Sequence, residues 1–593
     1  MAALFTTPKR NDTTAGTHVA EPDVRRRIGL AHGSWRRVTR RIVAGAVCAL
    51  TVSSLLMPSV SLAAEWVKVG GNKYNTAASD EAGTWSWDGA DDLKLNNYNG
   101  GEIQAAGKLN VNYSGTNIVT AEWIESINVS HGTNENAELN IQGDEGGTLS
   151  VTSTEDAILS TGNINIDGAG SVNATSTGFD AINAGGDLAI KGSGNVNATG
   201  ASDGIRANGN ITIDDSGAVT ARATKDKGIG ADKNLTIKGG GTVEASSADG
   251  EALWSGGNIN ISDGSQVKAN SEEDSAVVAT RKLTVTNASL NASGAVYGVH
   301  AWEGVTFDHA TVTARASAGG SQAIALFTDW DDIVIKNGSI VDALAEGEVS
   351  AAFSTRNDRP NEKGGHIYIS DSVVKAIARY VENGDGPIPY SENQDGETRR
   401  EPQGENIGII AQTSEGVTPA VISIIRSKVT AEGDTAAIFA RAMSADGKTI
   451  GTIKIENADI QTPEGGKVID YRKLRDGIYE AGQAIGTGDA TVDSLYIKAV
   501  AKSTTIAPPE VAKPEDPKPD ETKPAESKPA ESKQNPKPEG SKPTKAVAAS
   551  TTKAKTTGVL AATGDTSGAA IVATVLAGTA AIAAGTMANR KRS

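Results

Sequence analysis

The chain of 593 residues contains one cysteine, six histidines and few aromatic side chains, which form 4% of the sequence. One cysteine cannot build a disulfide framework or a site with several thiolates around a metal. The scarcity of aromatic residues beside 67 glycines argues against several ordinary globular cores and favours a repetitive architecture. The formal net charge of −16 disfavours nucleic acid as a partner, because an acidic surface repels phosphate groups.

The first 63 residues are typical of a secretory signal peptide. Clustered arginines precede an apolar stretch over Ile42–Leu62, which ends in small residues. This order predicts export from the cell with cleavage between Ala63 and Ala64. The lone Cys48 lies in the removed segment, so we expect the mature chain to contain no thiol. A retained membrane anchor is the alternative interpretation.

Residues 560–593 carry the most specific short motif in the chain. The motif is a pentapeptide made of Leu560, Ala561, Ala562, Thr563 and Gly564. A small, apolar run over Ala569–Ala588 and a basic end follow it. This order resembles the sorting signal of Gram-positive surface proteins. The resemblance implies that a sortase cuts the Thr563–Gly564 bond and joins the threonine carbonyl to an amine of peptidoglycan.

The same resemblance implies that the apolar run lies in the membrane as a helix before sorting. The usual family motif has proline in second place, whereas Ala561 matches a variant used by a subset of actinobacterial sortases. The class of sortase is therefore left open. We expect the mature protein outside the cell, covalently attached to the cell wall, with membrane contact only through its precursor segments. A plain tail-anchored helix is the alternative.

A linker rich in proline, lysine and glutamate is predicted for residues 507–559. Lys-Pro pairs recur every few positions between residues 508 and 545. Proline fixes φ and removes a backbone donor, so this stretch cannot pack and favours an extended polyproline conformation. We therefore expect a disordered stalk between the preceding domain and the sorting signal.

A β-prone triplet with apolar ends returns every 22 to 25 residues in the middle of the chain. The regular copies are Leu139–Ile141, Ile164–Ile166, Leu188–Ile190, Ile211–Ile213, Leu235–Ile237, Ile259–Ile261, Leu283–Val285 and Val305–Phe307. Two more short segments with apolar residues follow each copy, as at Val172 and Ile182, and turn residues separate them. Each repeat therefore predicts three short strands.

A period near 24 residues that contains three strands predicts an all-β parallel solenoid, or β-helix. Most parallel crossovers are right-handed, so we expect a right-handed solenoid. Weaker coils are predicted at Ile335, Ile369, Ile424 and Ile455. The solenoid is assigned to residues 139–506, including a C-terminal cap around Tyr471, and residues 64–138 are assigned to irregular first coils and an N-terminal cap.

Two repeated strings carry a second resemblance. Asp180-Ala181-Ile182-Asn183-Ala184 and Asp203-Gly204-Ile205-Arg206-Ala207 each lead into a triplet and a glycine-rich turn. They resemble bacterial extracellular β-helix proteins of the carbohydrate-binding type, which are related in shape to polysaccharide lyases. The resemblance covers roughly residues 140–340. It implies a polysaccharide ligand and calcium as a cofactor.

Stacking the coils in register predicts an acidic column at one corner, made of Asp156, Asp180 and Asp203 and continued by Lys227. Carboxylates one strand spacing apart repel one another unless a cation lies among them, and calcium prefers oxygen ligands. The three aspartates are therefore a candidate calcium site. The favoured alternative is a solvated acidic edge in which aspartate side chains cap turns.

The second predicted column is aromatic. Trp302 and Trp330 are expected in the same register of neighbouring coils, and Trp254 two positions earlier and two coils before Trp302. Exposed indoles along a rigid strand stack are suited to stacking on sugar rings, so these three residues are the candidate carbohydrate site. The alternative is that they pack on one another or under longer loops.

Three functions remain open from the sequence. The favoured one is a cell-wall-anchored adhesin that binds a polysaccharide or a host-surface glycan. A polysaccharide lyase or hydrolase on the same fold and a passive surface spacer are the alternatives. No Ser-His-Asp order and no metal-spaced histidine cluster stands out, so we assign no catalytic residue and do not expect an enzyme.

Overall fold

The structure of the protein is a computed structural model. It describes residues 63–122, 125, 127–130, 137–317, 322–359, 363–381, 391–392, 398–399, 405–445, 447–475, 478–488 and 499–509. These residues all belong to the first of two units of the chain, Met1–Ala512. The predicted signal peptide before Ala63, the stalk from residue 510 onward and the sorting motif lie outside the described residues. Ala507, the first residue assigned to the stalk, is the last residue of a β-strand.

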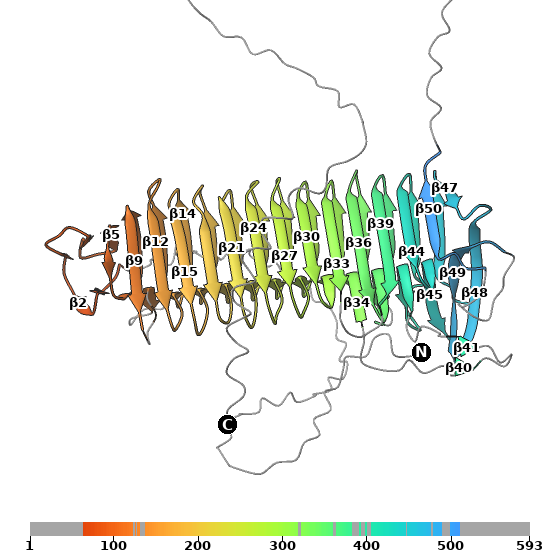
Figure 1. Ribbon diagram of the computed structural model, residues 1–593, viewed down its shortest axis with the longest axis horizontal. Coiled ribbons are helices and arrows are strands. Elements are labelled where there is room, and N and C mark those ends of the chain that lie inside the picture. The colour runs from red at the N-terminus through yellow and green to blue at the C-terminus, as the bar shows by residue number, and fades with distance from the viewer. Residues whose placement is uncertain are drawn as a thin grey trace, which may run out of the picture. The chain divides into compact units, whose positions relative to one another are not determined.

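All regular elements in these ranges are β-strands, and most of them form three sheets that run along a stack of coils (Figure 1). Each coil gives one strand to each sheet, in the order sheet A, sheet C and sheet B. Neighbouring coils pair through parallel strands. The predicted all-β parallel solenoid is therefore present. No helix in the described part of the chain is long and apolar enough to cross a membrane.

Sheet A has 16 strands. From the N-terminal end of the stack they are β3 (Ala78–Ser79), β4 (Trp85–Trp87), β5 (Asp92–Asn96), β8 (Lys108–Ser114), β11 (Glu138–Gly143), β14 (Asn163–Gly168), β17 (Leu188–Lys191), β20 (Ile211–Asp214), β23 (Leu235–Lys238), β26 (Ile259–Ser262), β29 (Leu283–Thr286), β32 (Val305–Asp308), β35 (Ile333–Lys336), β38 (Ile367–Ser370), β43 (Val421–Ile425) and β46 (Thr452–Glu456).

Sheet C has 15 strands. They are β6 (Asn99–Gly100), β9 (Thr116–Ala121), β12 (Thr148–Ser153), β15 (Ser171–Ser176), β18 (Val196–Gly200), β21 (Ala218–Ala223), β24 (Thr242–Ser247), β27 (Gln266–Ser271), β30 (Ser289–Gly294), β33 (Thr311–Ser317), β36 (Ile340–Gly347), β39 (Val373–Tyr380), β44 (Lys428–Gly433), β50 (Ser503–Ala507) and β47 (Asp459–Thr462).

Sheet B contains Trp254, and the other candidate site residues lie in the corners that flank its strands. Its strands are β2 (Asn72–Tyr74), β1 (Trp66–Val69), β7 (Ile103–Ala106), β10 (Ile127–Ser130), β13 (Ile158–Ser160), β16 (Ile182–Ala184), β19 (Ile205–Ala207), β22 (Ile229–Ala231), β25 (Leu253–Ser255), β28 (Val277–Ala279), β31 (Tyr297–Ala301), β34 (Gln322–Thr328), β37 (Val349–Asn357), β42 (Asn406–Thr413), β45 (Ala436–Ser444), β49 (Ile478–Gly486) and β48 (Lys467–Arg475). A separate short pair joins β40 (Ser391–Glu392) to β41 (Thr398–Arg399).

The predicted triplets are confirmed as the strands of sheet A from β11 onward. Ile164 pairs with Leu188 and Ile166 with Ile190, so the apolar ends of successive triplets stack on one another inside the solenoid. These side chains are fully or almost fully buried, whereas Asn165 between them faces outward and is half-buried. Burying an isoleucine or leucine side chain contributes about 1.5–3 kcal/mol, and the repeat supplies such side chains in every coil.

Antiparallel strands close both ends of the stack. At the N-terminal end β4 pairs antiparallel with β5, and Trp85 and Trp87 are buried there as cap residues. At the C-terminal end β50 pairs antiparallel with β44, and the β48–β49 hairpin, which contains Tyr471, pairs antiparallel with β45. Such strands cover the unpaired backbone groups that a parallel stack leaves at its ends.

Residues with a left-handed backbone recur at the corner between sheets A and C. The residues other than glycine with positive φ there include Asp215, Asp263, Asn287, His309 and Asn337. The backbone N–H of Asn287 donates to the carbonyl of Asp308 in the next coil. Asparagine and aspartate adopt this conformation at lower cost than most residues, and glycine adopts it with none of the Cβ strain. This corner therefore explains the recurring Asn, Asp and Gly of the repeat.

Replacing Asn287 tests this explanation, because its side chain is exposed and its φ is +49°. We expect Asn287→Ala to lower the free energy of unfolding by about 1 kcal/mol and Asn287→Gly to leave it unchanged or raise it. Urea denaturation of the full chain measures both values. Equal stability of the alanine and glycine variants would contradict the explanation.

Candidate functional site

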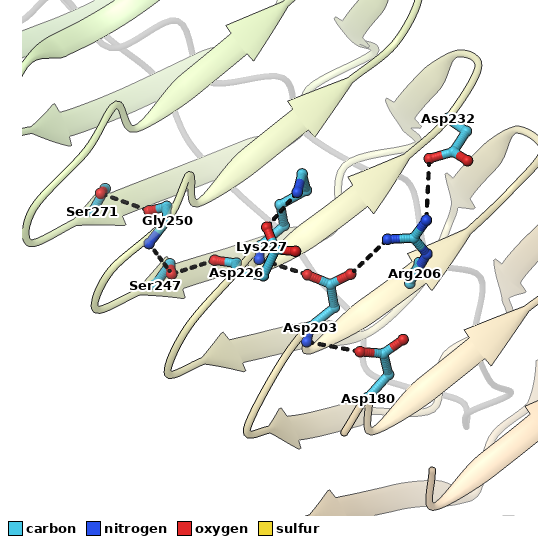
Figure 2. A network of polar contacts seen from close by, with 9 residues as sticks. All are labelled: Asp180, Asp203, Arg206, Asp226, Lys227, Asp232, Ser247, Gly250 and Ser271. Atoms are coloured by element: carbon cyan, nitrogen blue, oxygen red, sulfur yellow. Dashed lines mark hydrogen bonds and ion pairs between the residues drawn. The ribbon is translucent and has the colours of Figure 1, made fainter. Parts of the chain in front are cut away.

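The predicted acidic column lies at the corner between sheets C and B. Ile158, Ile182 and Ile205 pair in register across β13, β16 and β19. Asp156, Asp180 and Asp203 each stand two residues before these isoleucines, so they stack in successive coils. Figure 2 shows Asp180 and Asp203 at this corner with the residues around them. The prediction that the sequence repeat brings these three residues together is confirmed.

The carboxylates of the column bind backbone N–H groups of the following coil. Asp156 Oδ1 accepts from the N–H of Asp180 at 2.9 Å, and Asp180 Oδ1 accepts from the N–H of Asp203 at 2.9 Å. Asp203 Oδ1 accepts from the N–H of Lys227 at 2.6 Å. Asn183 Nδ2 donates to the second oxygen of Asp156 at 3.0 Å. Each aspartate therefore joins its own coil to the next.

This arrangement bears on both interpretations of the column. Asp203 is 0% exposed and Asp180 is 7% exposed, whereas Asp156 is half-buried, so two of the three aspartates of this hydrogen-bonded ladder are buried and not part of a solvated edge. Asp156, Asp180 and Asp203 also each accept a hydrogen bond from a backbone N–H group. These bonds stabilise the neighbouring carboxylates, which is the role that calcium was expected to fill. The described ranges contain no group of three or more His, Cys, Asp or Glu side chains that could hold a metal. The calcium site therefore finds no support in the geometry.

Basic side chains flank the ladder without entering it. Arg206 Nη1 lies 3.4 Å from Asp203 Oδ2, and its Nη2 lies 3.7 Å from Asp232 (Figure 2). The ammonium group of Lys227 pairs with Asp226, so Lys227 meets Asp203 through its backbone N–H. Both contacts stabilise the corner, because each pairs a basic side chain with an acidic one.

Burial raises the pKa of all three aspartates, and it raises the pKa of Asp203 to about 6. The hydrogen bond from Lys227 N–H opposes this shift, whereas the charge of Asp180 adds to it. The folded chain thus holds a proton on Asp203 at pH values where the unfolded chain has released it.

The ladder predicts a particular dependence of stability on pH. Because Asp203 binds its proton more tightly in the folded state, we expect the free energy of unfolding to fall as pH rises from about 4 to about 6. Asp203→Asn keeps an acceptor for Lys227 and removes the buried charge. We expect it to weaken this pH dependence and to raise stability at pH 7 by about 1–2 kcal/mol.

Urea denaturation at a series of pH values provides the measurement. Asp232→Asn is the matched control, because Asp232 pairs with the same arginine but is exposed. The control should keep the pH profile of the parent chain. If Asp203→Asn shows the same dependence of stability on pH as the parent chain, Asp203 does not hold the proton.

The predicted aromatic residues lie on the outer side of sheet B and at its corner with sheet A. Trp254 is in β25, where it pairs with Val278, and Val278 pairs with His300 in β31. Trp302 comes two residues after His300, so the predicted relation of Trp254 to Trp302 is confirmed. Trp254 is half-buried, with Lys227 Nζ 5.3 Å from its ring centroid.

Trp302 and Trp330 are in contact but do not share a register position. Ala301 pairs with Thr328, which places Trp302 beside Asp329 and Trp330 one residue further on. This corrects the predicted register. The two rings nevertheless meet edge to face with centroids 5.4 Å apart, and the backbone N–H of Trp330 donates to the Trp302 carbonyl at 3.0 Å. Trp302 is 39% exposed, so its indole is accessible from solvent.

Polar side chains from three coils lie around these indoles. His300 Nε2 lies 2.7 Å from Asp329 Oδ2, and Arg356 Nη2 lies 3.1 Å from Asp329 Oδ1. The guanidinium carbon of Arg359 lies 3.3 Å from the ring centroid of Trp330. Asp329 is thus held by two partners, and one face of Trp330 is covered by a cation.

Sequence reasoning missed His300, Asp329, Arg356 and Arg359. His300 lies in a coil of regular length, but Asp329, Arg356 and Arg359 lie in the two following coils, which are longer than the regular repeat. A fixed period therefore does not bring the four residues into one column. The signal that could have found them is the alternation within the lengthened sheet B strands, because Asp329 and Arg356 continue the outward positions of β34 and β37.

The same outward column ends in a buried cluster near the C-terminal cap. Arg356 pairs with Gln412, and Gln412 pairs with Arg441. Arg441 is 7% exposed and binds Glu405, Glu480 and the side-chain oxygen of Gln412. Burial opposes its charge, but the two carboxylates outweigh burial and hold the pKa of Arg441 above its usual value. This end of the column is therefore buried, whereas Trp302 is exposed.

No family model, curated protein or solved structure matches this chain. The sorting residues Leu560–Gly564 lie outside the described residues, as does the segment before the predicted cleavage site.

Proposed function

We propose that this chain is a secreted surface protein whose solenoid binds glycans and whose C-terminus is joined to the bacterial cell wall. The solenoid is taken to be right-handed, and the proline-rich segment is taken to act as a stalk. Calcium has no role in the proposal, and the protein is not proposed to be an enzyme.

The observation that carries the glycan-binding proposal is the exposed indole of Trp302. Its ring is set against Trp330, and the guanidinium of Arg359 lies over the ring of Trp330. An indole held in this way can stack on the apolar face of a sugar ring without first losing side-chain freedom. The aromatic surface is therefore pre-organised for a flat ligand.

Polar groups beside the indole suit a ligand with hydroxyl groups. Asp329 is oriented by His300 and Arg356, and Asp331 pairs with Lys282 Nζ at 3.0 Å close to the same corner. Carboxylates and guanidinium groups bind hydroxyls as acceptors and donors respectively. An aromatic platform with oriented polar groups at its edge is the usual composition of a site for a polar ligand with an apolar face.

The anchoring proposal is supported by the sequence at both ends of the chain. An export signal before Ala63, a stalk and the motif Leu560–Gly564 occur in the order that a sortase substrate needs. Sortase and peptidoglycan are accordingly the proposed partners of the C-terminus, and a glycan is the proposed partner of the solenoid.

Binding to a glycan array tests the first part of the proposal. We expect the full chain to bind at least one glycan, and Trp302→Ala to weaken that binding about tenfold or more, since truncating a central aromatic contact usually costs above ~1 kcal/mol. Phe179→Ala is the control, because Phe179 is 51% exposed at a different corner. No binding by the parent chain, or equal loss in both variants, would reject this site.

Cell fractionation tests the second part. Digestion of the wall with a muramidase should release the protein with peptidoglycan fragments attached. Thr563→Ala removes the threonine at which the acyl transfer is proposed, so we expect this variant in the membrane or the medium. Ala562→Ser is the matched control, because it leaves the threonine–glycine bond in place, and it should still be attached. Wall attachment that survives Thr563→Ala would contradict the proposal.

A further inference from the structure

A polar groove crosses the outer face of sheet A, away from the residues around Trp302. It has a volume of about 580 Å³ and crosses five neighbouring strands, β14, β17, β20, β23 and β26. Parallel strands lie ~4.8 Å apart, so the groove follows the solenoid axis for roughly 20 Å. Its length thus runs across the coils and not along any single strand.

One wall of the groove is a ladder of amide side chains. Asp187 N–H donates to Asn163 Oδ1, Asn210 Nδ2 donates to Asp187 Oδ1, and the same bond joins Asn234 to Asn210 and Asn258 to Asn234. Each of these Nδ2 groups carries two hydrogens, and the ladder uses one of them. The wall therefore offers fixed donors at a regular spacing.

The floor of the groove consists of the outward residues at the centre of each strand. Asn165 donates through Nδ2 to Asn140, which extends a second amide ladder up to this coil. In the next coil the equivalent residue is Ala189, which has no polar side chain. Within the described coils this second ladder therefore ends at Asn165. Thr212 and Thr236 follow at the same position and are half-buried.

The charges of the groove cancel although the chain as a whole is acidic. Its lining contains one carboxylate, Asp187, and one ammonium group, Lys191. Beside it Lys238 Nζ pairs with Asp214 at 2.9 Å. A strongly charged ligand would meet no opposite field there, so the lining fits an uncharged ligand with many hydroxyl groups.

We infer that this groove binds a linear glycan of uncharged sugars that lies along the solenoid axis. Equivalent donors and acceptors return in every coil, and only a polymer with repeating units can engage them in the same way at several coils. An extended peptide is less suited, because all five strands already pair on both sides and the groove has no apolar pocket for side chains. This inference deepens the proposed function, but it does not depend on Trp302.

Calorimetric titration of the full chain with cellohexaose, laminarihexaose, maltohexaose, mannohexaose and xylohexaose provides the test. We expect at least one of them to bind, and hexagalacturonate to bind at least tenfold more weakly. The double variant Thr212→Arg, Thr236→Arg fills the groove from its floor and should weaken binding at least tenfold. Thr306→Arg is the matched control at the same outward position in β32, beyond the groove, and should bind as the parent does.

Trp302→Ala separates this inference from the proposed site around Trp302. Retained hexasaccharide binding in Trp302→Ala together with loss in the double variant supports the groove, even if the array finds no ligand for Trp302. Loss in Trp302→Ala with full binding in the double variant overturns the groove and leaves the proposed function in place. The absence of binding by all five uncharged hexasaccharides, or equal affinity for hexagalacturonate, also overturns it. Circular dichroism of each variant establishes that it is folded.

Discussion

Every feature described above depends on the hydrogen-bonded register between one coil and the next. Parallel pairing in all three sheets holds equivalent residues of successive coils at a fixed spacing. The apolar positions therefore stack into one continuous core, and polar positions of the same type stack into ladders on the outside. A shift of one residue in any strand would turn its buried side chains outward, so the alternation of the repeat and the register reinforce each other.

The ladders explain how polar side chains are buried in this protein with hydrogen-bond partners. Asp180 and Asp203 leave water but gain the backbone N–H of the next coil. Serine side chains act in the same manner at this corner, where Ser247 accepts from Gly250 N–H and Ser271 donates to the Gly250 carbonyl (Figure 2). A carboxylate retains a raised pKa in such a ladder, whereas a hydroxyl does not titrate. The aspartate ladder is therefore the part of the corner whose contribution to stability changes with pH.

Much of the fold can be predicted from sequence because the apolar positions that form the core recur at a regular spacing. The alternation in copies such as Ile164–Ile166 predicts both a strand and which of its faces points into the core. The spacing between copies predicts the length of a coil. Prediction fails where coils differ in length. Trp302 and Trp330 lie one register step apart because the corner before β35 contains one residue more than the corner before β32. Arg359 meets Trp330 and Arg356 meets Asp329 across such lengthened coils, and no periodic pattern contains these contacts.

The candidate site around Trp302 and the groove on sheet A follow different physical rules. The groove arises from regularity, since the same amides and hydroxyls return in each coil from Asn163 to Asn258. The site around Trp302 arises from departures from regularity, since Asp329 directly follows the lengthened strand β34 and Arg356 lies in the lengthened strand β37. A rigid repetitive core thus supports one surface suited to a repeating polymer and one suited to a local contact.

The claim that this solenoid presents glycan-binding surfaces is tested most directly by a crystal structure of the protein with a bound oligosaccharide. The expected result is a sugar ring stacked on the exposed face of Trp302, a sugar chain along the groove beside Asn210 and Asn234, or both. Sugar bound only at other surfaces of the solenoid would contradict the claim.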